Sequence, residues 1–218
     1  MSFWNKNIKQ KLKNAAVIVA HPDDETLWCG GMILNGSDYN WEIITICRKN
    51  DPDRAPRFFQ ALKCYQAIGK MGDLDDGPEQ KPLNVKQLKN TILALLSRRE
   101  YDLVLTHSIN GEYTKHLRHE EVGRAVQALW NEKELQIGKL WMFAYEDGNK
   151  KYLPRAIRDA DHLDLLDKYT WDEKYRIITG VYNFLPESFE GKVTPRVEAF
   201  WRFNEPSKIK KLMKRRIK

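Results

Sequence analysis

The chain has 218 residues, of which 42% are apolar, 11% aromatic and 31% charged. These proportions are typical of a globular protein with a sizeable core, and they argue against a disordered or fibrous chain. The length favours one large domain, because domains commonly have about 100–200 residues. No apolar run approaches the roughly 20 residues that cross a bilayer, so we expect no membrane span. Residues 1–14 contain lysines but no apolar h-region, so we expect no secretory signal either.

The net charge of +7 is concentrated at one end of the chain. Residues 208–218 contain seven Lys or Arg and no acid, whereas residues 1–207 contain 30 basic and 30 acidic residues. We therefore expect a basic N-terminal segment (1–14), a single domain (15–207) and a basic tail (208–218). The neutral body argues against nucleic-acid binding. The tail has the pattern of a basic amphipathic helix, which suits peripheral contact with an anionic membrane. Its 11 residues are too few for a stable isolated helix, so we favour a solubilising or disordered tail.

The cysteine content is informative about the compartment. The three cysteines are an odd number and form no CxxC pair: Cys29, Cys47 and Cys64. This pattern predicts reduced thiols in the cytoplasm and excludes both a disulfide scaffold and a thiolate-based zinc finger.

Short apolar runs alternate with helical patterns along the first two thirds of the chain. The runs predict buried strands at residues 15–20, 41–47, 101–107 and 139–145. Apolar residues recur every three or four positions, as on a helix face, within residues 27–33, 58–68, 85–99 and 116–129. This alternation predicts an α/β domain in which a mostly parallel sheet lies between two layers of helices.

The pattern weakens after about residue 152. We expect a helix over residues 163–174, mixed structure over 175–184 and a loop-rich stretch over 186–203 with a short element at 197–203. We find no repeat and no low-complexity linker, so we expect this part to cover the same core.

Residues with catalytic chemistry follow two of the predicted strands. His21, Asp23 and Asp24 come directly after the first strand, while His116 and His119 open the helix after the third strand, which ends at His107. The carboxyl ends of parallel strands meet at one edge of a sheet, where ligands bind, so we expect these two groups to converge.

Such a convergence suits a catalytic metal site. One imidazole and one carboxylate from the first group, with one imidazole from the second, leave a fourth ligand position open for water. The remaining carboxylate can take a proton from that water, and the remaining histidine can stabilise the oxyanion or protonate the leaving amine. The simpler alternatives are a helix cap for the paired aspartates and a surface HxxH pair. The presence of both motifs after predicted parallel strands favours the metal site.

The string AHPDDE at residues 20–25, together with Gly111-Glu112-Tyr113 and the HLRH string at residues 116–119, resembles the LmbE-like, or PIG-L, family of zinc-dependent N-deacetylases. The resemblance extends from about residue 14 to 203, including Asp76-Gly77 and Glu198-Ala199-Phe200. It implies a Rossmann-like fold and removal of an acetyl group from an N-acetylglucosamine-type glycoconjugate.

The same resemblance implies roles for particular side chains. It makes His21, Asp24 and His119 the ligands of Zn²⁺, with Fe²⁺ as the alternative metal. Asp23 becomes the general base, and His116 faces the oxyanion or the leaving amine. Arg57 falls where the family often has an arginine that contacts substrate.

The chain departs from the family pattern between the two histidines, where Leu117-Arg118 replaces the usual Pro-Asp. A cation there should favour a neutral His116. Four basic residues crowd the loop after the second strand: Arg48, Lys49, Arg54 and Arg57. They either contact substrate or belong to a solvated loop in which Asp51 and Asp53 are their partners.

These observations predict a metal-dependent hydrolase that removes an N-acetyl group from an amino-sugar conjugate. Two alternatives remain open. One is a deacylase of a non-sugar amide, and the other is a non-catalytic protein that binds partners through its basic termini.

Overall fold

The computed structural model describes residues 12–79 and 81–209, and within these ranges a seven-stranded sheet has the order β3-β2-β1-β4-β5-β9-β8. The strands are β1 (Lys13–Val19), β2 (Tyr39–Cys47), β3 (Ile68–Leu74), β4 (Glu100–Thr106), β5 (Gln136–Phe143), β8 (His162–Leu165) and β9 (Val197–Phe203). Neighbouring strands from β3 to β5 pair in parallel, whereas β9 and β8 extend the sheet in antiparallel pairing. Two short strands, β6 (Tyr145–Glu146) and β7 (Arg155–Ala156), form a separate pair.

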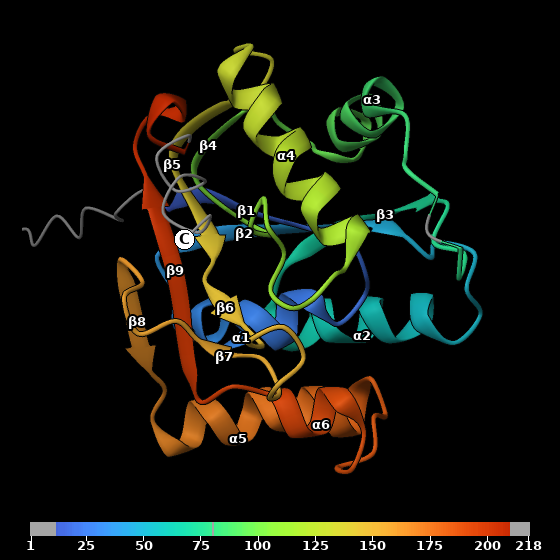
Figure 1. Cartoon of the computed structure of the whole chain (residues 1–218), viewed down its shortest axis with the longest axis vertical. Helices are drawn as coiled ribbons and strands as arrows, with labels where there is room; N and C mark the ends of the chain where they lie inside the picture. The colour runs from blue at the N-terminus through green and yellow to red at the C-terminus, as the bar shows by residue number, and fades with distance from the viewer. Residues whose placement is uncertain (1–11, 80, 210–218) are drawn as a thin grey trace, which may run out of the picture.

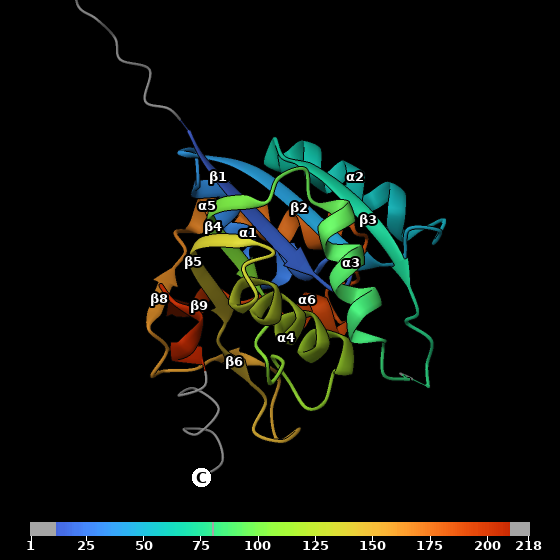
Figure 2. The same cartoon turned by 90° about the horizontal axis from the view of Figure 1, so that it is seen from above.

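Helices cover both faces of the sheet. The helices are α1 (Asp24–Asn35), α2 (Arg54–Tyr65), α3 (Val85–Leu95), α4 (Leu117–Asn131), α5 (Lys168–Arg176), α6 (Phe189–Val193), the π-helix η1 (Ile177–Val181) and the 3-10 helix η2 (Pro206–Lys208). Helices α3 and α4 lie above the sheet in Figure 1, and α1, α2, α5 and α6 lie below it. In the view from above, α3 and α4 are on the near side of the strands (Figure 2). The predicted three-layer α/β fold is thus confirmed.

The central strand explains why the sheet needs two covering layers. Every side chain from Ala15 to Ala20 is fully buried, so β1 is apolar on both of its faces. Strand β1 pairs with β2 on one side and with β4 on the other. The helices that follow β1 and β4 lie on opposite faces of the sheet (Figure 1). The ends of these two strands therefore form the switch point at which open α/β sheets bind ligands.

The expected helix over residues 58–68 is wrong at its end, because α2 stops at Tyr65 and residues 68–74 form β3. The two glycines of this strand allow it to pack closely. A Cβ atom at Gly69 would lie 2.2 Å from the carbonyl oxygen of Ile43, and one at Gly72 would lie 2.6 Å from that of Ile46. These glycines hide the strand from a pattern search, because they interrupt its apolar residues.

The expected helix over residues 163–174 is also divided. Its first part is the edge strand β8, and α5 begins only at Lys168. The side chain of Asp167 accepts a hydrogen bond from the Thr170 backbone N–H at 2.9 Å, which caps the helix at this point.

Residues 1–11 and 210–218, which include most of the two predicted basic segments, lie outside the described residues. The proposals for the segment 1–14 and the tail 208–218 therefore stay predictions. Within the described residues, no helix has both the length and the apolar character needed to cross a membrane.

Candidate metal and catalytic site

The chain turns sharply between β1 and α1, and this turn presents the first group of polar side chains. Asp23 has φ 117° and ψ −31°, a conformation that non-glycine residues rarely adopt. Its backbone N–H donates to Glu25 Oε2 at 3.0 Å. Glu25 is fully buried and also accepts the Tyr182 hydroxyl at 2.7 Å, so the carboxylate that holds the strained turn is itself fixed.

The end of β4 is tied to the end of β1 by His107. The Ala20 backbone N–H donates to His107 Nε2 at 3.0 Å, and His107 Nδ1 lies 2.9 Å from Glu112 Oε2. The same carboxylate oxygen lies 2.7 Å from His119 Nδ1. Although burial alone would raise the pKa of Glu112, the two histidines lower it to about 2. Because His107 Nε2 accepts the Ala20 N–H, that nitrogen is occupied, whereas His119 directs its Nε2 toward the end of β1.

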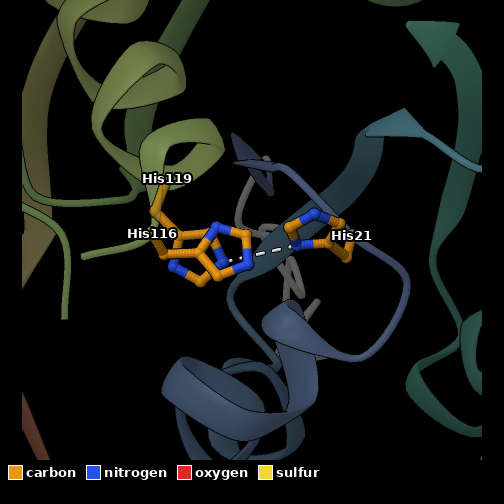
Figure 3. A group of neighbouring side chains, drawn as sticks. All are labelled: His21, His116 and His119. Carbon is orange, nitrogen blue, oxygen red and sulfur yellow. Dashed lines mark hydrogen bonds between the residues drawn. The ribbon is translucent and has the colours of Figure 1, made fainter. Parts of the chain in front are cut away.

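The two groups converge on one point, as the sequence predicts. His21 Nδ1 lies 3.0 Å from Asp24 Oδ2, and His119 Nε2 lies 3.3 Å from both His21 Nδ1 and Asp24 Oδ1. Figure 3 shows His119 at the start of α4 facing His21 across this gap. Ligands about 2.0–2.2 Å from a tetrahedral zinc ion lie roughly 3.3–3.6 Å apart, close to the 3.0–3.3 Å between these donor atoms, and their chemistry suits Zn²⁺ or Fe²⁺.

Hydrogen bonds from outside the donor set orient each of the three side chains. Asp24 accepts the His21 backbone N–H at 2.8 Å and the Trp28 indole N–H at 3.1 Å. Asp76 Oδ1 lies 3.1 Å from His21 Nε2, just as Glu112 lies behind His119. A carboxylate behind an imidazole fixes its tautomer and its orientation for metal binding.

The acidic and imidazole side chains of this group shift one another's pKa values. Burial alone would lower the pKa of His21, but Asp24 and Asp76 raise it to about 10. Burial would raise the pKa of Asp24, but His119 and His107 hold it well below its usual range. Carboxylates and imidazoles thus stabilise one another here.

Asp23 and His116 lie beside the three donor residues. Burial and the neighbouring Asp24 raise the pKa of Asp23 well above its usual range, and Arg54 NH1 lies 3.1 Å from Asp23 Oδ2. The His116 ring stacks on His119 with centroids 4.0 Å apart, and its buried Nδ1 has no hydrogen-bond partner among the described residues. Burial and the nearby His119 lower the pKa of His116 to about 3.

The neutral His116 agrees with the expectation from Arg118, but its cause is different. Arg118 faces away from His116, toward the loop after β3, where its Nε donates to the Asp75 carbonyl oxygen at 2.6 Å. The low pKa of His116 follows instead from burial and from the surrounding histidines.

A cavity of about 320 Å³ opens at this point. Its wall includes His21, Asp23, Asp24, Asp76, His116, Arg48, Arg54, Tyr113, Phe189 and Glu190.

The structure does not bring Arg57 into the wall of this cavity. Its guanidinium binds Asp53 Oδ1 through Nε at 2.8 Å and NH2 at 2.6 Å, and NH1 donates to the Val181 carbonyl oxygen at 3.2 Å. The arginines that line the cavity are therefore Arg48 and Arg54.

The sequence alone assigns no individual role to three carboxylates of this site: Glu25, Asp76 and Glu112. Asp76 contacts a histidine 55 residues away, and a local spacing cannot reveal such a pair. The only signal was that all three belong to strings that resemble the family.

The family model described as GlcNAc-PI de-N-acetylase (PIG-L) matches residues 16–130. The chain belongs to the PIG-L family. A curated relative, an uncharacterized protein of Acanthamoeba polyphaga mimivirus, is 30% identical to this PIG-L chain over 122 residues. That match covers 50% of this chain and 54% of the relative, so the chain spans about half the length of the curated relative it matches.

Solved structures share the fold of this PIG-L chain. N,N′-diacetylchitobiose deacetylase from Pyrococcus horikoshii has a TM-score of 0.65 at 12% identity, covering 88% of this chain and 84% of that one. The zinc-inhibited form of a teicoplanin deacetylase has a TM-score of 0.59 at 14% identity, covering 87% and 97%. GalB, a 4-carboxy-2-hydroxymuconate hydratase from Pseudomonas putida, has a TM-score of 0.59 at 13% identity, covering 88% and 96%. At these identities the likeness shows the fold alone.

Proposed function

We propose that this PIG-L protein is a metal-dependent de-N-acetylase that hydrolyses the acetamide of an amino-sugar conjugate of the N-acetylglucosamine type. The observation that carries the proposal is the 3.0–3.3 Å spacing among donor atoms of His21, Asp24 and His119 in the group that adjoins Asp23. The family match and the deacetylases among the fold neighbours support the same activity.

The donor residues His21, Asp24 and His119 would hold Zn²⁺, which acts as a Lewis acid and lowers the pKa of a bound water to about 7. The chain supplies the proton transfers. Asp23 accepts a proton from the attacking water as the new C–O bond forms at the acetyl carbonyl. The proton then passes to the sugar nitrogen as the C–N bond breaks, so that one water is consumed and acetate and a primary amine are released.

His116 is placed to act on the other side of the reaction. Its buried Nδ1 lacks a partner among the described residues, and its ring lies beside that of His119, with the centroids 4.0 Å apart. We propose that the His116 imidazole, which lines the cavity, hydrogen-bonds the developing oxyanion or the leaving amine.

The cavity suits a sugar in its size and its lining. The cavity volume of about 320 Å³ is near the lower end of the roughly 300–1,000 Å³ that is typical of small-molecule sites. Three side chains of the wall can form hydrogen bonds with hydroxyl groups: Arg48, Arg54 and Glu190. The rings of Tyr113 and Phe189 contact each other, with their centroids 5.2 Å apart, and offer apolar surface to a sugar ring. A non-sugar amide of similar size is the alternative substrate.

Product analysis tests the activity. The protein is incubated with a panel of N-acetylglucosamine conjugates and with non-sugar acetamides, with and without a chelator. We expect acetate and a primary amine in equal amounts from the sugar conjugates, and no release after the metal is removed. A hydratase activity such as that of the fold neighbour GalB would instead add water and give a single product.

A further inference from the structure

Arg118 is fully buried, yet it contributes nothing to the wall of the catalytic cavity. It lies beside His119 in the first turn of α4, and its guanidinium points toward the loop that follows β3. Arg118 Nε donates to the Asp75 carbonyl oxygen at 2.6 Å, and NH2 donates to the Lys81 carbonyl oxygen at 2.8 Å. A buried guanidinium is costly unless its donors are paired, so these contacts to backbone oxygens fix the loop firmly to the helix.

Glu121, on the same face of α4, completes the arrangement. Its Oε2 accepts Arg118 NH1 at 2.5 Å, and its Oε1 accepts the Leu83 backbone N–H at 2.8 Å. We call this pair of side chains the Arg118–Glu121 clasp.

The loop held by the clasp carries Asp76 to the metal site. Asp76 Oδ1 lies 3.1 Å from His21 Nε2, and Asp76 Oδ2 accepts Arg48 NH2 at 2.6 Å and Arg48 Nε at 2.9 Å. When His21 Nε2–H donates a hydrogen bond to Asp76 Oδ1, the lone pair of Nδ1 faces Asp24 and His119. Helix α4 is thus connected to both histidine ligands, directly through His119 and indirectly through the loop and His21.

We propose that the Arg118–Glu121 clasp is a positioning device that holds Asp76 against His21 and so sets the geometry of the first histidine ligand. This inference rests on the proposed metal site. Arg118 touches neither the donor atoms nor the cavity, so it acts only through the loop. A clasp that served fold stability alone would have no specific connection to Asp76.

A double-mutant cycle on the full chain distinguishes these roles. The variants are Arg118→Met, Asp76→Asn and the double variant, each loaded with Zn²⁺ alone and mixed with a chelator to measure the rate of zinc release. Because loss of an outer-shell partner typically costs about 10- to 100-fold in metal affinity, we expect Asp76→Asn to release zinc at least about 10-fold faster than the wild type. Arg118→Met acts through Asp76, so it should also speed zinc release, but by no more than Asp76→Asn does. In the Asp76→Asn background, the same substitution should add less than about twofold, because the contact it supports is already lost.

Arg124→Met is the matched control, because Arg124 forms an exposed pair with Glu120 on the same helix, at 2.6 Å. It should release zinc at the wild-type rate. If Arg118→Met does not fold, Arg118→Lys keeps the charge with fewer hydrogen bonds, and the same cycle is run with it. Wild-type release from the Arg118 variant, or multiplying effects in the double variant, would overturn the clasp.

The outcomes also separate the clasp from the proposed function. In one outcome, the wild type binds zinc and the variants give the expected zinc-release rates, while the wild type releases no acetate. That result would refute the deacetylase activity but would support the clasp. A wild-type chain that binds no zinc would overturn both.

Discussion

Asp23 and Asp24 are consecutive, yet their carboxylates face different partners. Asp24 Oδ2 lies 3.0 Å from His21 Nδ1, whereas Asp23 Oδ2 lies 3.1 Å from Arg54 NH1. The strained backbone of Asp23, with φ 117°, separates the two side chains at the start of α1. The carboxylate of Asp24 is therefore placed to bind a metal, while that of Asp23 is placed to accept a proton.

Asp23→Asn should abolish turnover and keep the metal. Asn tolerates a positive φ better than most residues, so the turn should survive the substitution. Loss of a general base typically costs about 100- to 10,000-fold in rate. We expect a fall of this size in kcat, measured as acetate release, with the zinc content of the wild type by elemental analysis. A variant with wild-type kcat would show that another group takes the proton.

Arg54→Met should lower kcat, because Arg54 is paired with Asp23 and also lies over the Phe184 ring, 4.3 Å from its centroid. A misplaced catalytic group can cost about 100-fold, so we expect a loss between roughly 10- and 100-fold. Circular dichroism would check that the fold is kept.

Arg57→Met is the matched comparison, because Arg57 lies on the same helix but binds Asp53 and Val181 outside the cavity. We expect its kcat and KM to stay within about twofold of the wild type. The substrate contact that the family resemblance implies for Arg57 predicts instead a clear rise in KM, so steady-state kinetics of the two variants decides which arginine serves the site.

Glu198→Gln should destabilise the fold. Glu198 is fully buried, lies 2.7 Å from Lys174 Nζ, and accepts the backbone N–H groups of Gly31 and Met32 at 2.7 and 2.8 Å. Both N–H groups follow the kink of α1 at Cys29. Breaking a buried ion pair costs about 3–5 kcal/mol, so we expect a loss near the lower end of that range in the free energy of unfolding by denaturant.

The exposed pair of Glu173 and Arg176, at 2.8 Å, is the control for this measurement. Glu173→Gln should change the free energy of unfolding by less than about 1 kcal/mol, because solvent weakens surface pairs. Equal losses of unfolding free energy in the two glutamate variants would show that the buried Lys174–Glu198 pair stabilises the fold no more than an exposed pair does.

The convergence of His21 and Asp24 with His119 was predictable, because each motif follows a recognisable buried strand and parallel strands bring their ends to one edge. The sequence does not reveal the roles of Asp76 and Glu112, because a supporting carboxylate is defined by its three-dimensional proximity to a histidine and has no fixed spacing from it along the chain. The strand β3 was hidden for a local reason, since Gly69 and Gly72 occupy positions where a side chain would collide with β2. The contacts of Arg118 were likewise hidden, because they reach backbone oxygens of a distant loop.

The most direct test of the metal site is the zinc content of the wild type beside that of His21→Ala and His119→Ala, with acetate release measured on the same samples. The site predicts about one zinc ion per chain in the wild type, lost together with acetate release in both variants. Arg124→Met, on the exposed face of α4, should keep both. Unchanged zinc content in His21→Ala and His119→Ala would contradict the site, since their nitrogens could then not be its ligands.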